Sequence, residues 1–291
     1  MLEFTVIICL KNLCIINIVK KLNILNLEML DSYDTRIKHF WINVDKNEKR
    51  KTFMETQFKS IGIKNYRISA ITPNDFDNVL AQKRPLSCKH PGCTSCEYEY
   101  ACISSHIKAL QHALNVSQDS NEWFVIMEDD IYLPFDIDYH KLIQDAPKDA
   151  ELIQTLILYG PTVKILYDLH LQNIKFIKWQ YLLPSTGMYL ISRKGAEKLV
   201  NMFFKNNKYD FSSSPFQIVA DVTLYSSINS YATTFPFAYP NIDMGSEIHP
   251  DHLKAHSAAI KDIKDVIEDA VSCKRLLCIN KYIPESTYSL L

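Results

Sequence analysis

Three consecutive acidic residues, Glu128, Asp129 and Asp130, follow the apolar run 123–127. The run is rich in aromatic and β-branched residues, and this pattern predicts a buried strand. Carboxylates at the end of a buried strand are costly unless something compensates them, and hard divalent cations prefer oxygen ligands. Because successive strand side chains alternate between faces, we expect Glu128 and Asp130 to bind a metal together and Asp129 to point the other way. The other interpretation is a polar strand end entering a loop, since short motifs also occur by chance.

The composition limits how a nucleotide can be held. The chain has 291 residues, a formal net charge of −1, 47% hydrophobic residues and 22% charged residues. These values are typical of a globular protein and give no electrostatic case for binding nucleic acid. The six glycines include no glycine-rich phosphate loop. A bound nucleotide must therefore be held by carboxylates, a metal and loops at strand ends.

The pattern of apolar residues predicts alternating strands and helices. A strand at 37–44, a helix at 47–61 that ends at Gly62, and a strand at 66–71 predict a parallel βαβ unit. Thr94 and Glu97 fit a capping box at the start of a helix that runs to residue 116. Further strands are expected at 152–159, 175–183, 187–192 and 231–237, and further helices at 193–204, 220–228 and from 258. We therefore expect an α/β domain over 37–257 and a helical tail over 258–291.

The N-terminal extension, residues 1–36, has two interpretations. Its apolar run, Phe4–Val19, contains Lys11 and Asn12, and no small-residue cleavage site follows it. A membrane span needs about 20 apolar residues with few charges. We therefore favour a poorly packed extension or amphipathic helix over a signal anchor. This interpretation goes with a cytoplasmic location, whereas a signal anchor would give a membrane-associated or secreted protein.

A cysteine-rich segment leaves three interpretations open. Cys88, His90, Cys93 and Cys96 lie within nine residues, and Cys93 and Cys96 have the spacing of a zinc knuckle. Structural zinc, a local disulfide and free thiols in a surface loop all fit this pattern.

Five segments, in order, resemble motifs of glycosyltransferase family 25, which includes lipopolysaccharide and procollagen galactosyltransferases. The segments are Ile42–Asp45 with Arg50, Arg67–Ala70, Ala101–His106, Ile126–Ile131, and Thr186–Ser192 with Gly195 and Ala196. The resemblance spans roughly residues 37–250. Two features depart from it, because no glycine follows the second strand and residues 83–96 form a cysteine-rich insertion. These departures concern the acceptor site.

The resemblance implies a GT-A type fold, a Rossmann-like mixed sheet flanked by helices. It also implies transfer of galactose or glucose from a UDP-sugar, commonly with Mn²⁺ and with inversion, to a glycan or protein hydroxyl. In such a reaction a metal on Asp130 and Glu128 neutralises the leaving diphosphate, and Asp129 either contacts the ribose or sugar hydroxyls or orients a neighbouring side chain. Asp221 is the candidate base, and its alternative interpretation is a helix N-terminal residue that accepts backbone hydrogen bonds. A catalytically silent relative that binds a sugar or nucleotide is the alternative function.

Other candidate residues come from the same motifs. The nucleotide-binding candidates are Asn43, Arg50, Arg67 and His106, and the candidates lining the acceptor side are Thr186 and Gly187. His106 is equally well explained as a hydrogen-bonded core histidine. The segment Ser246–Ile248 resembles the closing motif of the family, and His249 beside it is the candidate that completes the metal site. The sequence indicates neither the sugar and its acceptor nor the oligomeric state.

Overall fold

The computed structural model describes residues 37–88, 94–117, 119, 122–245, 253–272 and 282–283. The predicted N-terminal extension lies outside these residues. So do three members of the candidate metal sites, His90, Cys93 and His249. None of the helices in the described ranges combines the length and hydrophobicity that a bilayer-spanning segment needs.

The described chain is built around a mixed seven-stranded sheet with the order β2-β1-β3-β7-β5-β10-β6. Its strands are β1 (Lys38–Asn43), β2 (Asn65–Ser69), β3 (Trp123–Glu128), β5 (Leu152–Gln154), β6 (Phe176–Lys178), β7 (Met188–Ser192) and β10 (Ser230–Thr233). Both β2 and β3 pair in parallel with β1, and β10 pairs in parallel with β5. Strand β7 is antiparallel to β3 and β5, and β6 is antiparallel to β10. The predicted mixed α/β sheet is confirmed.

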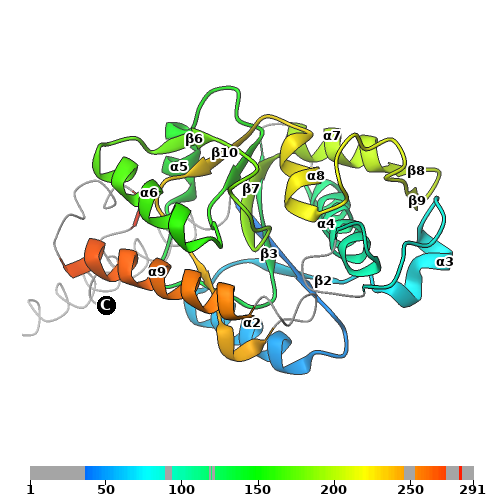
Figure 1. Cartoon of the computed structure of the whole chain (residues 1–291), viewed down its shortest axis with the longest axis horizontal. Coiled ribbons are helices and arrows are strands. Elements are labelled where there is room, and N and C mark those ends of the chain that lie inside the picture. The colour runs from blue at the N-terminus through cyan, green and yellow to red at the C-terminus, as the bar shows by residue number, and fades with distance from the viewer. Residues whose placement is uncertain are drawn as a thin grey trace, which may run out of the picture. The chain divides into compact units, whose positions relative to one another are not determined.

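Helices cover both faces of the sheet (Figure 1). One face packs against α2 (Glu48–Ile61), α5 (Tyr139–Asp145), α6 (Gly160–Leu171) and α9 (Leu253–Ser272), and the other against α4 (Glu97–Val116), α7 (Arg193–Phe203) and α8 (Ala220–Ser226). Residues of β3 alternate between the two cores, since Val125 and Met127 join the first and Phe124 and Ile126 the second. This alternation explains why the whole run is apolar.

The first βαβ unit forms as the sequence predicts. Asn47 caps α2 by accepting a hydrogen bond from the backbone of Arg50, and Gly62 ends the helix with φ +71°. Left-handed φ favours glycine because other residues clash there. This unit brings the carboxyl ends of β1, β2 and β3 to one edge of the sheet, where Asn43, Ser69 and Glu128 lie.

Several boundaries differ from the prediction. Helix α4 begins at Glu97 with Cys96 as its N-cap, so the predicted cap at Thr94 is wrong by two residues. Strands β5 and β6 are much shorter than the apolar runs that suggested them. Residues 155–158 are still buried or half-buried without belonging to a strand, because packing in the core, and not sheet pairing, makes this segment apolar.

Short elements fill the connections. They are η1 (Pro73–Asp75), α3 (Phe76–Val79) and η2 (Ile242–Met244), with two-stranded pairings between β4 (Ile131–Tyr132) and β11 (Tyr239–Pro240) and between β8 (Phe204–Lys205) and β9 (Lys208–Tyr209). Helix α9 lies beside α6 and contributes Ile263, Val266 and Ile267 to the core (Figure 1). The tail helix, expected from residue 258, begins at Leu253. It packs into the same compact unit as the sheet.

Candidate active site

The acidic triplet lies at the carboxyl edge of the sheet, but strand alternation does not govern it. Strand β3 ends at Glu128, and Asp129 and Asp130 form the turn that leads into β4. Both aspartates contact Arg50, whereas the Glu128 side chain contacts Thr186 and His106. The expectation that Asp129 points away from the other two because of strand geometry is therefore wrong, since a turn imposes no two-residue period.

Asp129 is the centre of a buried polar network. Its carboxylate accepts hydrogen bonds from Arg50 Nη1 at 2.6 Å and from Asn43 Nδ2 at 2.7 Å. Arg67 Nε in turn donates to Asn43 Oδ1 at 2.8 Å, and Arg67 Nη2 pairs with Asp45 at 2.6 Å. The network ties the carboxyl ends of β1 and β2 to the acidic turn. It brings together three predicted site residues, Asn43, Arg50 and Arg67.

Arg50 also joins the turn to a distant part of the chain. Its Nη2 lies 3.1 Å from Asp130 Oδ2 and donates to the carbonyl oxygen of Gly245 at 2.5 Å. The backbone N–H of Asn241 donates to the carbonyl oxygen of Asp130 at 2.7 Å. Residues 241–245 are thus attached directly to the acidic turn, four residues before His249, which lies outside the described residues.

The acidic turn carries more negative charge than its described surroundings compensate. Burial raises the pKa of Asp130 to about 7. The ion pair with Arg50 opposes this rise, and the negative charges of Glu128 and Asp129 contribute to it. Among the described residues, Arg50 is the basic side chain that forms ion pairs with the aspartates of this turn. The three carboxylates of the triplet face one guanidinium, which leaves an excess of two negative charges when all are ionised. Carboxylate oxygens with such an excess of charge suit a hard divalent cation such as Mn²⁺ or Mg²⁺. The residues present therefore fit a metal of this class.

Glu128 contacts a second group of side chains, on α4 and in the loop that precedes β7. Thr186 Oγ1 donates to Glu128 Oε1 at 2.7 Å, and His106 Nε2 lies 3.7 Å from the same oxygen. The other ring nitrogen of His106 is hydrogen bonded to the hydroxyl of Tyr189 at 3.1 Å. Burial opposes ionisation of Glu128, but His106, Thr186 and Arg50 outweigh it and lower its pKa. Glu128 is therefore an anionic group held in one orientation.

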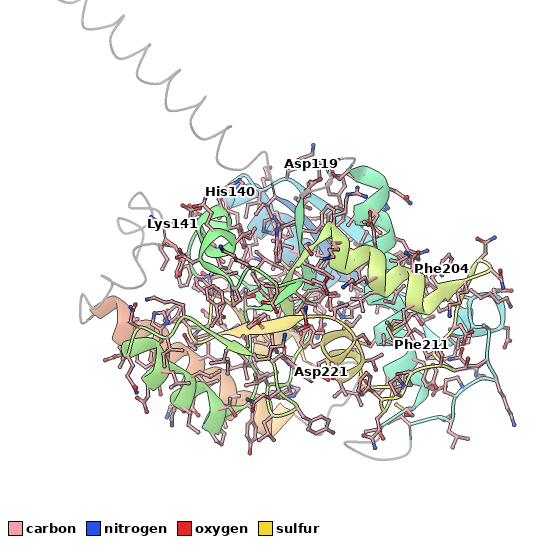
Figure 2. All side chains as sticks on the ribbon, turned by 90° about the horizontal axis from the view of Figure 1, so that it is seen from above. Asp119, His140, Lys141, Phe204, Phe211 and Asp221 are labelled. Carbon is pink, nitrogen blue, oxygen red and sulfur yellow. The ribbon has the colours of Figure 1, made fainter. Side chains whose placement is uncertain are left out.

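Asp221 lies at the start of α8, where Figure 2 labels it. Its two carboxylate oxygens accept hydrogen bonds from the backbone N–H groups of Ser185, at 3.0 Å, and Val222, at 2.7 Å. Burial raises the pKa of Asp221, and these two hydrogen bonds oppose the rise. The Asp221 side chain is thus fixed, and each oxygen keeps a second lone pair for another donor.

Ser185 is a residue that the sequence did not single out. Its φ of 122° is strained for a residue with a side chain. Three contacts hold it there: its carbonyl oxygen accepts from Gln154 and from the Tyr225 hydroxyl, and its Oγ accepts from the Gly187 N–H. The strained segment places Thr186 against Glu128 and the Ser185 N–H against Asp221. A serine gives no sequence signal for such a conformation.

Gly187 has a packing role in addition to its predicted place at the acceptor side. A Cβ atom at this position would lie 2.9 Å from side-chain atoms of Ile131 and Leu156. The carbonyl oxygen of Gly187 accepts a hydrogen bond from the Glu128 N–H at 2.9 Å. The absence of a side chain here lets the start of β7 approach the acidic end of β3.

Cys102 and Glu99 were also missed as site residues. They lie on the face of α4 that carries His106, at spacings of four and seven residues from it. Burial, together with the negative charges of Asp221 and Glu128, raises the pKa of Glu99 to about 7. The signal in the sequence was the helical spacing of these polar residues among apolar ones, which is typical of a polar patch on an inward helix face.

A cavity of about 800 Å³ lies beside α8. Its lining includes Trp179, Tyr181, Phe216, Gln217 and Asn229, together with Val222, the residue after Asp221. Tyr181 is 63% exposed and Phe216 is 36% exposed, so these rings present apolar faces to solvent. Exposed aromatic rings mixed with amide side chains are typical of a small-molecule site.

With the fold and site described, comparison with known proteins identifies the class. The family model described as glycosyltransferase family 25 (LPS biosynthesis protein) matches residues 36–213, which is more than half of the chain. The chain belongs to this family and is a glycosyltransferase. The mixed sheet with an acidic turn at its parallel carboxyl edge agrees with the GT-A type fold that the sequence led us to expect. No protein of curated function matches the sequence significantly.

Solved structures show only distant similarity. A glycosyltransferase involved in glycosylation of the major capsid of PBCV-1 is 11% identical, with a TM-score of 0.36 over 75% of this chain and 90% of that one. A nucleoside-diphosphate-sugar pyrophosphorylase from Vibrio cholerae RC9 is 10% identical, with a TM-score of 0.31 over 71% and 76%. Glucosyl-3-phosphoglycerate synthase from Mycobacterium tuberculosis, in complex with Mn²⁺, UDP and glucosyl-3-phosphoglycerate, is 11% identical, with a TM-score of 0.30 over 84% and 82%.

Proposed function

We propose that the protein transfers a hexose, galactose or glucose, from a UDP-sugar to a hydroxyl group of a glycan or protein, with a divalent metal and with inversion. The observation that carries the proposal is the acidic turn. In a member of a glycosyltransferase family, it places Glu128, Asp129 and Asp130 at the parallel carboxyl edge of the sheet with Arg50 as their paired cation. Ligands of open α/β sheets bind at this edge.

In this proposal the residues of the acidic turn have different roles. Glu128 and Asp130 hold the metal, with His249 as the candidate third ligand, and Mn²⁺ bound there would neutralise charge on the leaving diphosphate. Of the two roles expected for Asp129, we assign it the orienting one: its carboxylate accepts hydrogen bonds from Arg50 and Asn43, so it positions them and leaves the ribose to other groups. Asn43 and Arg67 then form the wall of the nucleotide site.

Asp221 is the proposed catalytic base. The acceptor oxygen attacks the anomeric carbon, the bond to the diphosphate breaks, and the acceptor proton moves to the Asp221 carboxylate. The Ser185 and Val222 N–H groups hold that carboxylate in place, so no reorientation is needed during the reaction. A raised pKa makes a carboxylate a stronger base, and burial raises the pKa of Asp221.

The cavity beside α8 is the proposed acceptor site. Tyr181 and Phe216 offer aromatic faces to the C–H faces of a sugar, and Gln217 and Asn229 offer amide groups to its hydroxyls. Val222 lines this cavity and follows the proposed base directly in the sequence, which supports the assignment of the acceptor to this cavity.

The test is a donor screen followed by product analysis. Thermal-shift measurements with UDP-galactose, UDP-glucose and UDP-N-acetylhexosamines, with and without Mn²⁺, identify the donor. NMR of the product then reports the anomeric configuration, which inversion predicts to be opposite to that of the donor. Asp221→Asn should lower turnover by about 10²–10⁴-fold and leave donor binding intact, while Asp168→Asn, an exposed carboxylate on α6, is the control. UDP-sugar binding without turnover in the wild type would favour the silent relative.

A further inference from the structure

A thiol, an imidazole and a carboxylate converge between α4 and the end of β3. Cys102 and His106 are four residues apart on α4, and such residues lie on the same side of a helix. Glu128 faces them from β3. The Cys102 sulfur, a His106 ring nitrogen and a Glu128 carboxylate oxygen all lie within 4.8 Å of one another.

The spacing of these atoms is close to that of a tetrahedral zinc site. Zinc binds thiolate sulfur at about 2.3 Å, histidine nitrogen at about 2.0 Å and carboxylate oxygen at about 2.0–2.2 Å, so ligand atoms lie roughly 3.3–3.7 Å apart around the ion. The distance of 3.7 Å between His106 Nε2 and Glu128 Oε1 agrees with this geometry. The remaining separations, which are at most 4.8 Å, need to shrink by no more than about 1.5 Å, which side-chain rotation provides.

Neighbouring groups already orient two of the three ligands. The Tyr189 hydroxyl is bonded to His106 Nδ1 at 3.1 Å, so Nε2 is the nitrogen directed at Glu128. Thr186 donates to Glu128 Oε1 at 2.7 Å, and it also contacts the Cys102 thiol. Metal-binding histidines and carboxylates typically have partners of this kind, which fix the ring and the carboxylate in place.

The local charge favours a cation, and the site is open to solvent. Three carboxylates among the described residues, Glu99, Glu128 and Asp221, act on Cys102. The side chain of Glu128 is 31% exposed, and Cys102 is half-buried. An ion can therefore enter, and a water molecule can occupy the fourth position that three protein ligands leave open.

We propose that Cys102, His106 and Glu128 bind Zn²⁺, at a site distinct from the carboxylate site of Asp130. Sulfur and nitrogen ligands select Zn²⁺ over the harder Mn²⁺ and Mg²⁺, which prefer oxygen. The two sites share Glu128, so Zn²⁺ bound to Cys102 and His106 withdraws one carboxylate from the other metal. Zn²⁺ should then inhibit Mn²⁺-dependent sugar transfer; this consequence, unlike the binding itself, rests on the proposed function.

Cobalt substitution tests the binding without any activity assay. Co²⁺ added to the full chain should give the intense visible bands of a tetrahedral ion and a thiolate-to-cobalt charge-transfer band, and Zn²⁺ should displace both. Competition with a chromophoric chelator gives the zinc affinity. We expect Cys102→Ser to remove the charge-transfer band of this site and to weaken zinc binding by at least about 10–100-fold, because losing even a supporting partner of a ligand costs that much. His106→Gln should weaken zinc binding similarly.

The control addresses the other cysteines of the chain. Cys93→Ser changes the cysteine-rich segment and should leave the bands that depend on Cys102 intact, and circular dichroism confirms that each variant is folded. Zinc affinity and cobalt spectra unchanged in both folded variants, Cys102→Ser and His106→Gln, would overturn the proposal. A protein that binds Zn²⁺ through Cys102 but turns over no UDP-sugar would refute the proposed function and leave this site standing.

Discussion

Replacing Arg50 by methionine should destabilise the fold strongly. Arg50 is the described cation between Asp129 and Asp130, and its side chain is 9% exposed against 7% and 15% for its partners. Removing one partner of a buried ion pair costs about 3–5 kcal/mol, because the remaining charge stays buried without compensation. Methionine has a similar length and fills the space, so loss of charge and hydrogen bonds dominates the change in free energy.

The measurement is urea unfolding at pH 7.5 in EDTA, followed by circular dichroism. With a slope of about 3 kcal/mol per molar urea for a chain of this size, the midpoint should fall by about 1–1.7 M. Lys51→Met, the next residue on α2, is the matched control, since its pair with Glu48 is at the surface and contributes less than about 1 kcal/mol.

A second variant separates the ion pair from other effects of the substitution. Combining Arg50→Met with Asp129→Asn removes the uncompensated charge, so the double variant should lose less stability than the two single variants together. An Arg50→Met midpoint equal to that of Lys51→Met would refute the buried network, and so would strict additivity in the double variant.

Three further predictions concern packing, protonation and the acceptor. Gly187→Ala should cost about 1–3 kcal/mol of unfolding free energy, because its Cβ would lie 2.9 Å from Ile131 and Leu156; an unchanged unfolding midpoint would contradict this packing. Burial lowers the pKa of His39 to about 3, so the unfolded chain binds more protons below its ordinary pKa of 6.5. His39 should therefore destabilise the fold by about 2–3 kcal/mol between pH 6.5 and 4.5, and His39→Gln, unlike the exposed control His112→Gln, should flatten the measured pH dependence of unfolding. Tyr181→Ala should raise the KM for the acceptor about 3–10-fold and leave UDP-sugar hydrolysis unchanged, whereas an equal effect of Tyr159→Ala, an exposed tyrosine outside the cavity lining, would remove the cavity from the account.

Local patterns in the sequence predicted the parts of the fold that local physics determines. The strand before Asn43, the helix capped by Asn47 and the end of that helix at Gly62 all follow from periodicity and capping chemistry. The start of α4 was misplaced because Thr94 and Glu97 match a capping box, whereas Ser95 has a left-handed φ of 57° and Cys96 is extended. The sequence alone does not show when the tertiary structure overrides a local capping motif.

The candidate site was predicted as a set of residues but not as a geometry. The acidic triplet, Arg50 and Asn43 do lie together. Strand alternation predicted that Asp129 and Asp130 point in opposite directions, but the turn after Glu128 directs both aspartates towards Arg50. A turn depends on contacts far along the chain, such as the hydrogen bond from Asn241 to Asp130. The strained backbone of Ser185 is likewise held by tertiary contacts, and a serine at that position does not predict a positive φ.

The most direct test of the central claim is UDP release from UDP-galactose and UDP-glucose in the presence of a mixture of glycan acceptors, with Mn²⁺ or with EDTA. We expect release by the wild type with Mn²⁺, little release with EDTA, and a loss of at least about 100-fold in Asp130→Asn, a change that removes one metal ligand and keeps the side-chain shape. Release that is equally fast with EDTA, or equally fast in Asp130→Asn, would contradict a metal–diphosphate site at the acidic turn.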